Sequence, residues 1–454
     1  MEICFYGFEE IDNDKLKFAV VCASLKGRWI FGRHRERSTW ETPGGHREPN
    51  EDIAEAAKRE LYEESGAVGC TLEPVCIYSV TFDGKTDYGA LFYADVKEIG
   101  PLPESEIGEV RLFKKLPAEL TYPEIFSVLF RKVADYLTEK YIGLLNCDIV
   151  RNINIVQFLR SYRAYSFDRV GDSLLIRGTS DEDWVYISSA SEEEFDHLIE
   201  GLDDEDKCFA VLEDWMLPAV IRGREISSRL TSMKLVYDDE VYECRKTGKC
   251  AEAEGTKPAA GTGTYEGTKL YEGVKPAKFS KPADDTKSAE FTKPAEFTKS
   301  AEYMQPEEGA QPAADTNPLP AASKGPCAII PEVTDLTIPD APVLYNNSDY
   351  REYISIGYIE ERILNGTGVG IHKDGRLVGW ALTHDDGAIG FLHVLEDYRR
   401  MGYAARITEA MVSRLIAAGE VPFLHIEESN AASMSLAVKA GFRKDRRIHW
   451  IKLA

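Results

Sequence analysis

Strand-like alternation of apolar and polar residues dominates the first 140 residues of the chain. The segments with this pattern are FAVVCASL (18–25), RWIFGRH (28–34), CTLEPVCIYSVTF (70–82), YGALFYADV (88–96) and EVRLFKKL (109–116). The segment EIFSVLFRKVADYLTEKY (124–141) has the apolar spacing of an amphipathic helix. The pattern therefore predicts a first α/β domain over residues 1–140.

A second α/β pattern covers residues 330–454. Its expected strands are VGIHKDGRLVGWALTH (369–384, a hairpin), GAIGFLHVLEDY (387–398), PFLHIE (422–427) and FRKDRRIHWIKLA (442–454), and its expected helices are AARITEAMVSRLIAAG (404–419) and NAASMSLAVKAG (430–441). Residues 145–240 form a third region, in which NIVQFLRSYRAYSF (154–167) predicts a helix and DSLLIRGTSDEDWVYISS (172–189) a hairpin.

Residues 250–325 show neither the alternation of a strand nor the apolar spacing of a helix. They are rich in Pro, Ala, Lys, Glu, Thr and Gly, and the units KSAEFT, KPAEFT and KSAEYM follow one another in tandem. Such a composition offers few apolar side chains to bury, so it predicts a disordered linker between the second and third α/β regions.

The most informative motif lies between the first strands and the later ones. Five residues separate Gly45 from Glu51, and seven more precede the run Arg59-Glu60-Leu61-Tyr62-Glu63-Glu64-Ser65-Gly66. A helix here would bury Ile53, Ala57 and Leu61 and would place Glu60, Glu63 and Glu64 on one patch. Carboxylates this close repel one another unless a hard cation neutralises them, and Mg²⁺ is the cation that such oxygen ligands share with phosphates.

This spacing resembles the Nudix box of hydrolases that cut diphosphates linked to another group. The resemblance implies an α/β/α sandwich, Mg²⁺ or Mn²⁺ as cofactor, and catalysis through Glu51, Arg59, Glu60, Glu63 and Glu64. It implies metal ligands at Gly45, Glu60, Glu63, Glu64 and a loop carboxylate, for which we choose Glu106 ahead of Glu109. Ahead of the box, RERSTWETPGGHREP is similar to nucleotide-housecleaning enzymes of the 8-oxo-dGTP hydrolase kind. Trp40 there either stacks on a base or is packed.

The second motif, Arg399-Arg400-Met401-Gly402-Tyr403-Ala404, follows an expected strand and opens an expected helix. Amide groups at such a helix N-terminus point at an anion. In this context the motif resembles the pyrophosphate loop of GCN5-related N-acetyltransferases (GNAT), and NAASMSLAVKAGF supports the resemblance. The resemblance implies that acetyl-CoA or another acyl-CoA is bound by Leu392, His393, Val394, Arg399, Arg400, Met401, Gly402, Tyr403, Ala404, Asn430 and Ser433.

The chain departs from that family at one position. Ala437 stands where the family commonly has a tyrosine that protonates the leaving thiolate, so Ser433 or water would have to serve. His393 and Glu396 are the candidates for the base. Residues 145–240 are similar to the N-terminal lobe of two-lobed acyltransferases of the glycine N-acyltransferase kind.

Composition limits the partners. The formal net charge is −23, which argues against a nucleic-acid polymer as main partner. We expect a small nucleotide or diphosphate substrate, an amine acyl acceptor and no membrane. The acidic N-terminus without a signal peptide and the nine scattered cysteines predict a cytoplasmic protein with reduced thiols.

The whole chain is therefore expected to be an α/β multidomain protein: a Nudix sandwich, an acyltransferase-like lobe, a disordered linker and a GNAT domain. The first functional hypothesis is a bifunctional enzyme that hydrolyses a nucleoside diphosphate-linked substrate and transfers an acyl group from acyl-CoA to an amine. The alternative is a Nudix hydrolase whose C-terminal domain only binds acyl-CoA, as a sensor or scaffold.

Overall fold

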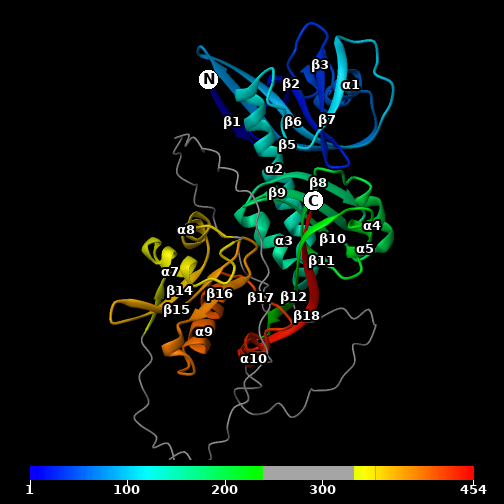
Figure 1. Ribbon diagram of the computed structural model, residues 1–454. Coiled ribbons are helices and arrows are strands. Elements are labelled where there is room, and N and C mark those ends of the chain that lie inside the picture. The colour runs from blue at the N-terminus through cyan, green and yellow to red at the C-terminus, as the bar shows by residue number, and fades with distance from the viewer. Residues whose placement is uncertain (239–331, 353) are drawn as a thin grey trace, which may run out of the picture. The chain divides into compact units, whose positions relative to one another are not determined.

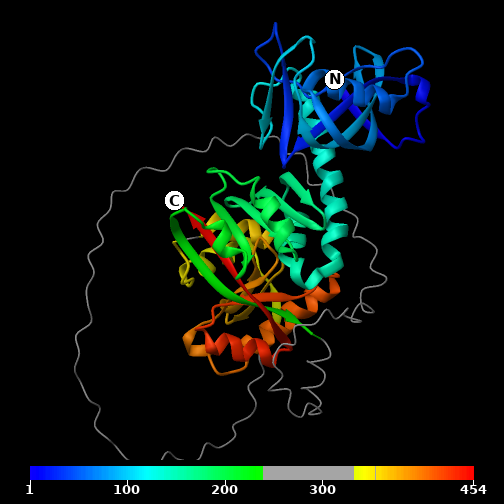
Figure 2. The ribbon, with the colours of Figure 1, turned by 90° about the vertical axis from the view of Figure 1, so that its right-hand side faces the viewer.

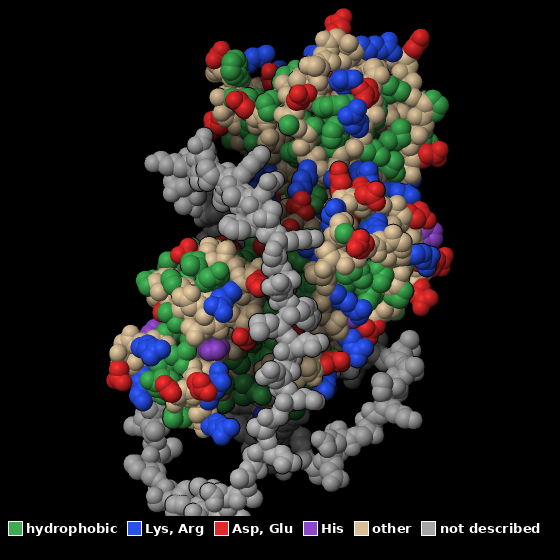
Figure 3. Space-filling model, viewed as in Figure 1, with side chains coloured by type: hydrophobic (Ala, Val, Ile, Leu, Met, Phe, Trp, Pro, Cys, Tyr) green, Lys and Arg blue, Asp and Glu red, His purple; other side chains and the backbone are tan. Residues whose placement is uncertain are grey.

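The computed structural model describes residues 1–238, 332–352 and 354–454, and these all belong to one compact unit (Figure 1). The expected linker at 250–325 lies outside the described residues. Within the described ranges, none of the helices is both long enough and apolar enough to cross a membrane. Acidic and basic side chains are mixed over the face shown in Figure 3.

The N-terminal sheet has seven strands in the order β1-β5-β6-β2-β3-β7, with β4 paired to β2. Its strands are β1 (Glu2–Tyr6), β2 (Leu16–Leu25), β3 (Arg28–His34), β4 (Gly44–His46), β5 (Ala67–Phe82), β6 (Lys85–Ile99) and β7 (Ile107–Phe113), with the short 3₁₀ turn η1 (Asn13–Lys15) before β2. The pair β2–β6 is parallel, whereas the others are antiparallel.

Helix α1 (Ile53–Ser65) carries the first motif, and its two ends are set by the sequence. The carboxylate of Asp52 accepts a hydrogen bond from the backbone N–H of Ala54 and caps the N-terminus. Gly66 ends the helix in the left-handed conformation, with φ at 69°. Glu51 therefore precedes the helix.

The two faces of this sheet are covered by two helices, which confirms the expected sandwich. On one face, the stripe of α1 packs against the sheet through Ile53, Ala57 and Leu61. On the other face lies α2 (Pro123–Leu145), whose Phe130 stacks on Phe31 with ring centroids 5.2 Å apart. The expected domain boundary at residue 140 lies within α2.

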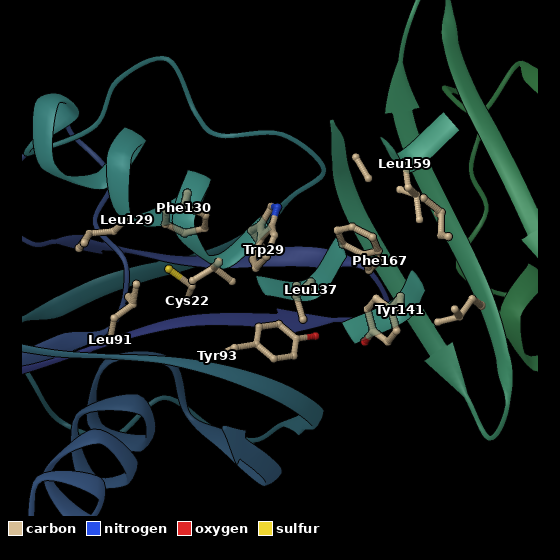
Figure 4. Packing of buried hydrophobic residues seen from close by; sticks show 14 of the residues in the cluster. Cys22, Trp29, Leu91, Tyr93, Leu129, Phe130, Leu137, Tyr141, Leu159 and Phe167 are labelled. Atoms are coloured by element: carbon tan, nitrogen blue, oxygen red, sulfur yellow. The ribbon is translucent and has the colours of Figure 1, made fainter. Parts of the chain in front are cut away.

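The C-terminal half of α2 continues the same hydrophobic cluster. Leu137 and Tyr141 lie beside Phe167 and Leu159 of the following region (Figure 4). The rings of Tyr141 and Phe167 are 5.3 Å apart. The cluster that begins around Trp29 therefore extends without a break into residues 145–240.

The second sheet has eleven strands in the order β13-β14-β15-β16-β17-β12-β18-β11-β10-β9-β8. From residues 145–240 come η2 (Asn146–Asp148), α3 (Ile149–Ser161), β8 (Ala164–Val170), β9 (Ser173–Thr179), β10 (Asp183–Ser188), α4 (Glu192–Ile199), β11 (Cys208–Glu213), α5 (Leu217–Val220) and β12 (Ile226–Tyr237). From residues 330–454 come β13 (Val333–Asp335), η4 (Ile338–Asp340), α7 (Ala341–Asn346), α8 (Ile356–Asn365), β14 (Gly368–Lys373), β15 (Arg376–Thr383), β16 (Ile389–Val394), η5 (Glu396–Tyr398), α9 (Tyr403–Ala417), β17 (Phe423–Ile426), α10 (Ala431–Lys439) and β18 (Phe442–Leu453).

The two regions exchange their last strands. β12 lies between β17 and β18, and β18 lies between β12 and β11, so each region completes the sheet of the other (Figures 1 and 2). The β12–β18 pairing runs from Ile226↔Leu453 to Tyr237↔Phe442. We expected two neighbouring α/β lobes and find one continuous sheet. Helix α3 also begins and ends earlier than the helix expected at 154–167, and β8 begins at Ala164.

Candidate active sites

The carboxylates of the first motif converge on one guanidinium. Arg59 donates to both oxygens of Glu51, at 2.9 and 3.0 Å, to Glu60 at 2.8 Å and to Glu63 at 3.2 Å. These hydrogen bonds lower the pKa of Glu51 and raise that of Arg59. The structure thus brings three predicted catalytic carboxylates together around a fourth predicted residue, Arg59.

Glu64 is held apart from that guanidinium. One of its oxygens accepts a hydrogen bond from the backbone N–H of Gly44 at 2.9 Å. Burial raises the pKa of Glu64 to about 8, and the nearby charge of Glu60 acts in the same direction. Burial likewise raises the pKa of Glu60. Two carboxylates that are costly to ionise side by side thus lie at the surface of α1 facing β4.

The two glycines of the motif are required by close contacts. A Cβ atom on Gly45 would collide with the carboxylate of Glu60, and one on Gly44 would lie 2.6 Å from the carbonyl oxygen of Ala19. Gly45 also pairs with Ala19 in the β2–β4 ladder. Glycine therefore lets this short strand run directly against the carboxylates of α1.

The predicted loop carboxylate lies at the edge of this group. Glu106 is 3.4 Å from His34, its side chain is 67% exposed, and its charge contributes to the raised pKa of Glu64. The sequence reasoning missed Glu41, whose pKa is raised by burial and whose charge also acts on Glu64. Glu41 lies outside the spacing of the motif, and only its place shortly before Gly44 could have pointed to it.

A polar cavity of about 680 Å³ opens beside Glu106 and Glu41. It is lined by Arg33, His34, Arg35, Glu36, Arg37, Ser38, Gly108 and Glu109. Arg33 pairs with Glu109, and Arg37 pairs with Glu41 at 3.0 Å. The guanidinium of Arg35 is exposed and has no carboxylate partner among the described residues. Trp40 is packed, 6% exposed, with Arg33 and Arg111 over its ring.

The donor set at α1 fits a hard divalent cation in its chemistry. Glu60, Glu63 and Glu64 offer carboxylate oxygens, and the nearest fixed positive charge, on Arg59, does not reach Glu64. Within the residues that the structure describes, no three such side chains are yet close enough to enclose an ion. A cation that binds here would have to replace Arg59 as the partner of Glu60 and Glu63. The hydrogen bonds between Arg59 and Glu51 would remain.

The second motif lies where two parallel strands separate. β16 and β17 pair only at Ile389↔Leu424, whereas β16 stays paired to β15 as far as Val394. Phe391 has a φ of 52°, which marks an irregularity in β16 just past this point. From Gly390 onward, β16 has no strand partner on its β17 side among the described residues.

The predicted phosphate loop closes the wide end of this opening. Gly402, with φ at 85°, precedes α9, and none of the described side chains caps that helix. Arg400 also has a positive φ, 61°, and Met401 is 55% exposed. The uncapped amide groups of a fifteen-residue helix, next to exposed Arg400, suit a diphosphate. Arg399 instead donates to the carbonyl of Val394 at 3.1 Å and braces the loop.

The other predicted cofactor residues divide between exposed and structural positions. Leu392 is 36% exposed, whereas His393 stacks on Trp380 at 4.9 Å. Tyr403 is buried, and the carbonyl of Ala404 accepts from Thr408. Asn430 caps α10 by accepting from the backbone N–H of Ser433 at 3.0 Å. Ala437 is buried at 2% exposure, so this face of α10 offers no hydroxyl there.

Residues 145–240 contain a second strand–helix–strand unit of the same order, β10–α4–β11. Here the parallel strands remain paired over Trp184↔Cys208, Val185↔Phe209 and Tyr186↔Ala210. The first turn of α4 holds Glu192, Glu193 and Glu194. Three carboxylates at the helix N-terminus repel an anion, so the described geometry of this unit does not provide a phosphate site.

Comparison with known proteins gives two family matches. A model described as NUDIX domain matches residues 15–124, and one described as FR47-like protein matches residues 368–451. The curated Bacillus subtilis (strain 168) protein "Putative 8-oxo-dGTP diphosphatase YtkD" is 30% identical over 122 residues, which cover 26% of this chain and 75% of that protein.

Among solved structures, a mutant of the Bacillus subtilis pyrophosphohydrolase BsRppH is 24% identical, with a TM-score of 0.27, over 30% of this chain and 90% of its own. A GCN5-related N-acetyltransferase-like protein from Streptococcus suis 89/1591 is 11% identical, with a TM-score of 0.35, over 70% of this chain and 99% of its own.

Proposed function

The chain belongs to the Nudix family through residues 15–124 and carries an FR47-like, GNAT-like domain at residues 368–451, and from this premise we propose two activities. The first is metal-dependent hydrolysis of a diphosphate linkage in a small nucleotide. The observation that carries it is the group of carboxylates on α1, shared between Arg59 and the backbone of Gly44.

Each residue of the α1 site has a role in this proposal. Glu60, Glu63 and Glu64 hold Mg²⁺ or Mn²⁺ together with the carbonyl of Gly45, and Glu106 adds a carboxylate from the loop. When bound, the ion activates a water and neutralises the phosphate oxygens. Arg59 stays hydrogen-bonded to Glu51 and positions the carboxylates of Glu60 and Glu63. The cavity lined by Arg35 receives the distal phosphates of a nucleotide such as the one in the name of the YtkD relative.

Replacement of two proposed metal ligands tests the hydrolase. Glu64→Gln and Glu63→Gln should each lower Mg²⁺-dependent turnover of 8-oxo-dGTP, dGTP or dinucleoside polyphosphates by at least about 100-fold, as expected when a metal ligand is lost. Glu55→Gln is the matched control, because Glu55 lies on the exposed side of the same helix and pairs with Lys58. Near-normal rates in both ligand variants, with the fold retained, would refute the assignment.

The second proposed activity is acyl transfer from acyl-CoA to an amine. It is favoured by the uncapped N-terminus of α9 at the end of the β16–β17 opening. In this proposal the diphosphate lies on the amides that follow Gly402, beside Arg400, and the extended arm of the cofactor follows the free edge of β16. The alternative, a domain that binds acyl-CoA without transfer, uses the same contacts.

A negative charge at the loop tests cofactor binding. Gly402→Asp should abolish acetyl-CoA binding in calorimetry while nucleotide hydrolysis persists. Gly375→Asp is a matched control, since Gly375 is also an exposed glycine with positive φ, in the β14–β15 turn. Absence of binding by the wild type would leave only the fold resemblance. Binding without transfer to any amine would support the sensor alternative.

A further inference from the structure

An imidazole that the predicted motifs did not include lies where β16 and β17 separate. His384 sits in the tight turn between β15 and β16, closed by a hydrogen bond from the backbone N–H of Gly387 to the carbonyl of His384. A side chain on Gly390 would collide with its Nε2 atom. The glycine therefore leaves room for the ring directly beside the first residue of β16 that has no described partner on the β17 side.

The ring lies on the face of the sheet opposite α9. Gly390 pairs with Leu382, and residues directly opposite in an antiparallel pair share a face. Leu382 packs with Leu344 of α7 and Ile359 of α8. On the other face, Ile407 of α9 lies 3.0 Å from where a Cβ of Gly379 would be. A cofactor bound at α9 and a second substrate bound at His384 would thus approach each other from opposite faces of the sheet.

The place where they would meet follows from the pairing of the strands. Consider an elongated ligand whose phosphates lie at the N-terminus of α9 and whose amides bond to the free edge of β16. It can extend along β16 only as far as the point where β17 pairs with that strand. This occurs at Ile389↔Leu424. Its reactive end would then lie beside Gly390, within reach of the ring of His384 on the α7/α8 face.

The surroundings of His384 are polar and fixed. Asp386 accepts from Asn154 of α3 at 2.7 Å, and the same amide group is 2.9 Å from Nε2 of His425 on β17. The Oδ1 atom of Asn154 is buried and has no partner among the described atoms. Asp385 accepts from Tyr358 of α8 at 3.3 Å.

The charged and titratable groups that face the ring come from several elements. They are Asp386 in its own turn, Arg362 of α8, Asp181 of the β9–β10 turn and His425 of β17, with Asp385 and Tyr358 beside them. Carboxylates outnumber guanidinium groups in this set. The ring nitrogens of His384 have no hydrogen-bond partner within the described parts of the chain, and its ring is 4.8 Å from that of Phe391.

We infer that His384 is the catalytic base of the acyl transfer and that the acceptor is a cationic primary amine drawn to Asp385 and Asp386. This inference rests on the proposed acyl transfer. The ammonium group of the acceptor first loses one proton to solvent. The neutral amine nitrogen then attacks the thioester carbonyl carbon, a C–N bond forms, and the C–S bond breaks with its electron pair on sulfur. Nε2 of His384 takes the proton that nitrogen loses and later releases it to solvent, while the thiolate takes a proton from water.

The arrangement explains why the ring is free to act. Burial lowers the pKa of His384, so its neutral form predominates at neutral pH and can accept a proton. Asn154 is a positioning residue, because its amide group contacts Asp386 in the turn and His425 on β17. This assignment differs from the earlier candidates: His393 stacks on Trp380, and exposed Glu396 lies beyond the end of β16.

The test uses the full chain, acetyl-CoA, and three amines of increasing positive charge: butylamine, putrescine and spermidine. The wild type should release CoA thiol faster as the charge increases. His384→Ala should bind acetyl-CoA with unchanged affinity and transfer at least about 100-fold more slowly. Added imidazole should restore part of the rate, which a merely structural role would not allow. His384→Gln, closer in shape, guards against misfolding, and His372→Ala is the control for losing a partly exposed imidazole.

The outcomes separate this inference from the proposed function. Failure of the wild type to bind acetyl-CoA overturns both. Binding with no acetylation of any of the three amines overturns the base and the cationic acceptor and leaves a binding domain. Transfer by the wild type with an equal rate in both His384 variants overturns the base while the acyltransferase stands. A slow, imidazole-rescued His384→Ala supports the inference.

Discussion

Single charges decide how the N-terminal site would recognise its substrate. Arg35 lines the cavity beside Glu106 and has no carboxylate partner among the described residues, whereas Arg33 and Arg37 are paired. We predict that Arg35→Gln raises the KM for a nucleoside triphosphate about tenfold with little change in kcat, since one phosphate contact is worth about 1.4 kcal/mol. Steady-state kinetics against Lys97→Gln, an exposed lysine on β6, is the measurement; an unchanged KM would contradict the role.

A second residue links pH to the stability of the large sheet. Burial lowers the pKa of His425 to about 4. The unfolded chain therefore binds a proton first as the pH falls from 6.5, so the stabilisation is present above that pH and is lost toward pH 4. Between pH 6.5 and 4 we predict that the wild type loses about 3 kcal/mol of unfolding free energy more than His425→Gln does.

Urea titrations at several pH values measure this difference. Comparing the two proteins matters, because burial raises the pKa of Asp385 to about 6 and that carboxyl acts in the opposite direction. A group with a raised pKa stabilises at low pH and loses its contribution as the pH rises through 6. Parallel pH profiles for wild type and His425→Gln would refute the assignment to His425.

At the residue scale, the sequence predicted what helical spacing controls. Glu60, Glu63 and Glu64 belong to the same stretch of α1 because of a local period, and Gly45 lies against Glu60. What it could not predict is that Arg59 engages three of the predicted carboxylates while Glu64 turns to Gly44. Glu41 and His384 were missed because each reaches its site through a turn and a sheet contact, which no fixed spacing encodes.

At the scale of the elements, the stability of α1 depends on the conformation of the residue that ends it. Gly66 has a φ of 69°, and a Cβ there would lie 2.9 Å from the carbonyl oxygen of Gly100. We predict that Gly66→Ala lowers the unfolding free energy by about 1–2 kcal/mol and, by shifting the preceding carboxylates, also lowers hydrolysis.

The matched substitution lies within α2. Gly143 is exposed, and a Cβ there would meet nothing within 4 Å. Gly143→Ala should therefore raise the unfolding free energy by about 0.5–1 kcal/mol. Denaturant titration of both variants gives the comparison. If Gly66→Ala were as stable as the wild type, the left-handed cap would not be needed.

Most of the elements that were predicted have bounds close to those observed, since alternation and helical period are local properties. The exceptions show the limit. The helix expected over 154–167 gives way to β8, because Ala164 and Phe167 are buried in the sheet rather than along a helix face. The positions of β12 and β18 depend on pairing between residues far apart in the chain, and period-two patterning does not identify a strand's partner.

For the whole molecule, the exchanged strands imply that two separate pieces of chain hold together. We predict that a protease site inserted between residues 286 and 304 can be cut without separating residues 1–238 from 332–454 in size-exclusion chromatography. β12 is bonded to β17 on one edge and β18 on the other, and its Leu235 is fully buried. Leu235→Asp should release the halves after cutting, whereas Leu230→Asp, at a position 41% exposed, should not. Separation of the cut wild type would contradict the exchange.

Because of the same pairing, the length of the repeat region should have little effect on the stability of the eleven-stranded sheet. β12 and β13 are both fixed in the eleven-stranded sheet, so the chain between them has only to connect two anchored ends. Adding or losing one KPAEFT unit would change the free energy of closing that loop by less than about 0.1 kcal/mol. Replication slippage in this stretch of the gene would therefore hardly change the stability of either sheet. Tandem copies can accumulate there, whereas an insertion within a strand of the two sheets would disrupt its pairing.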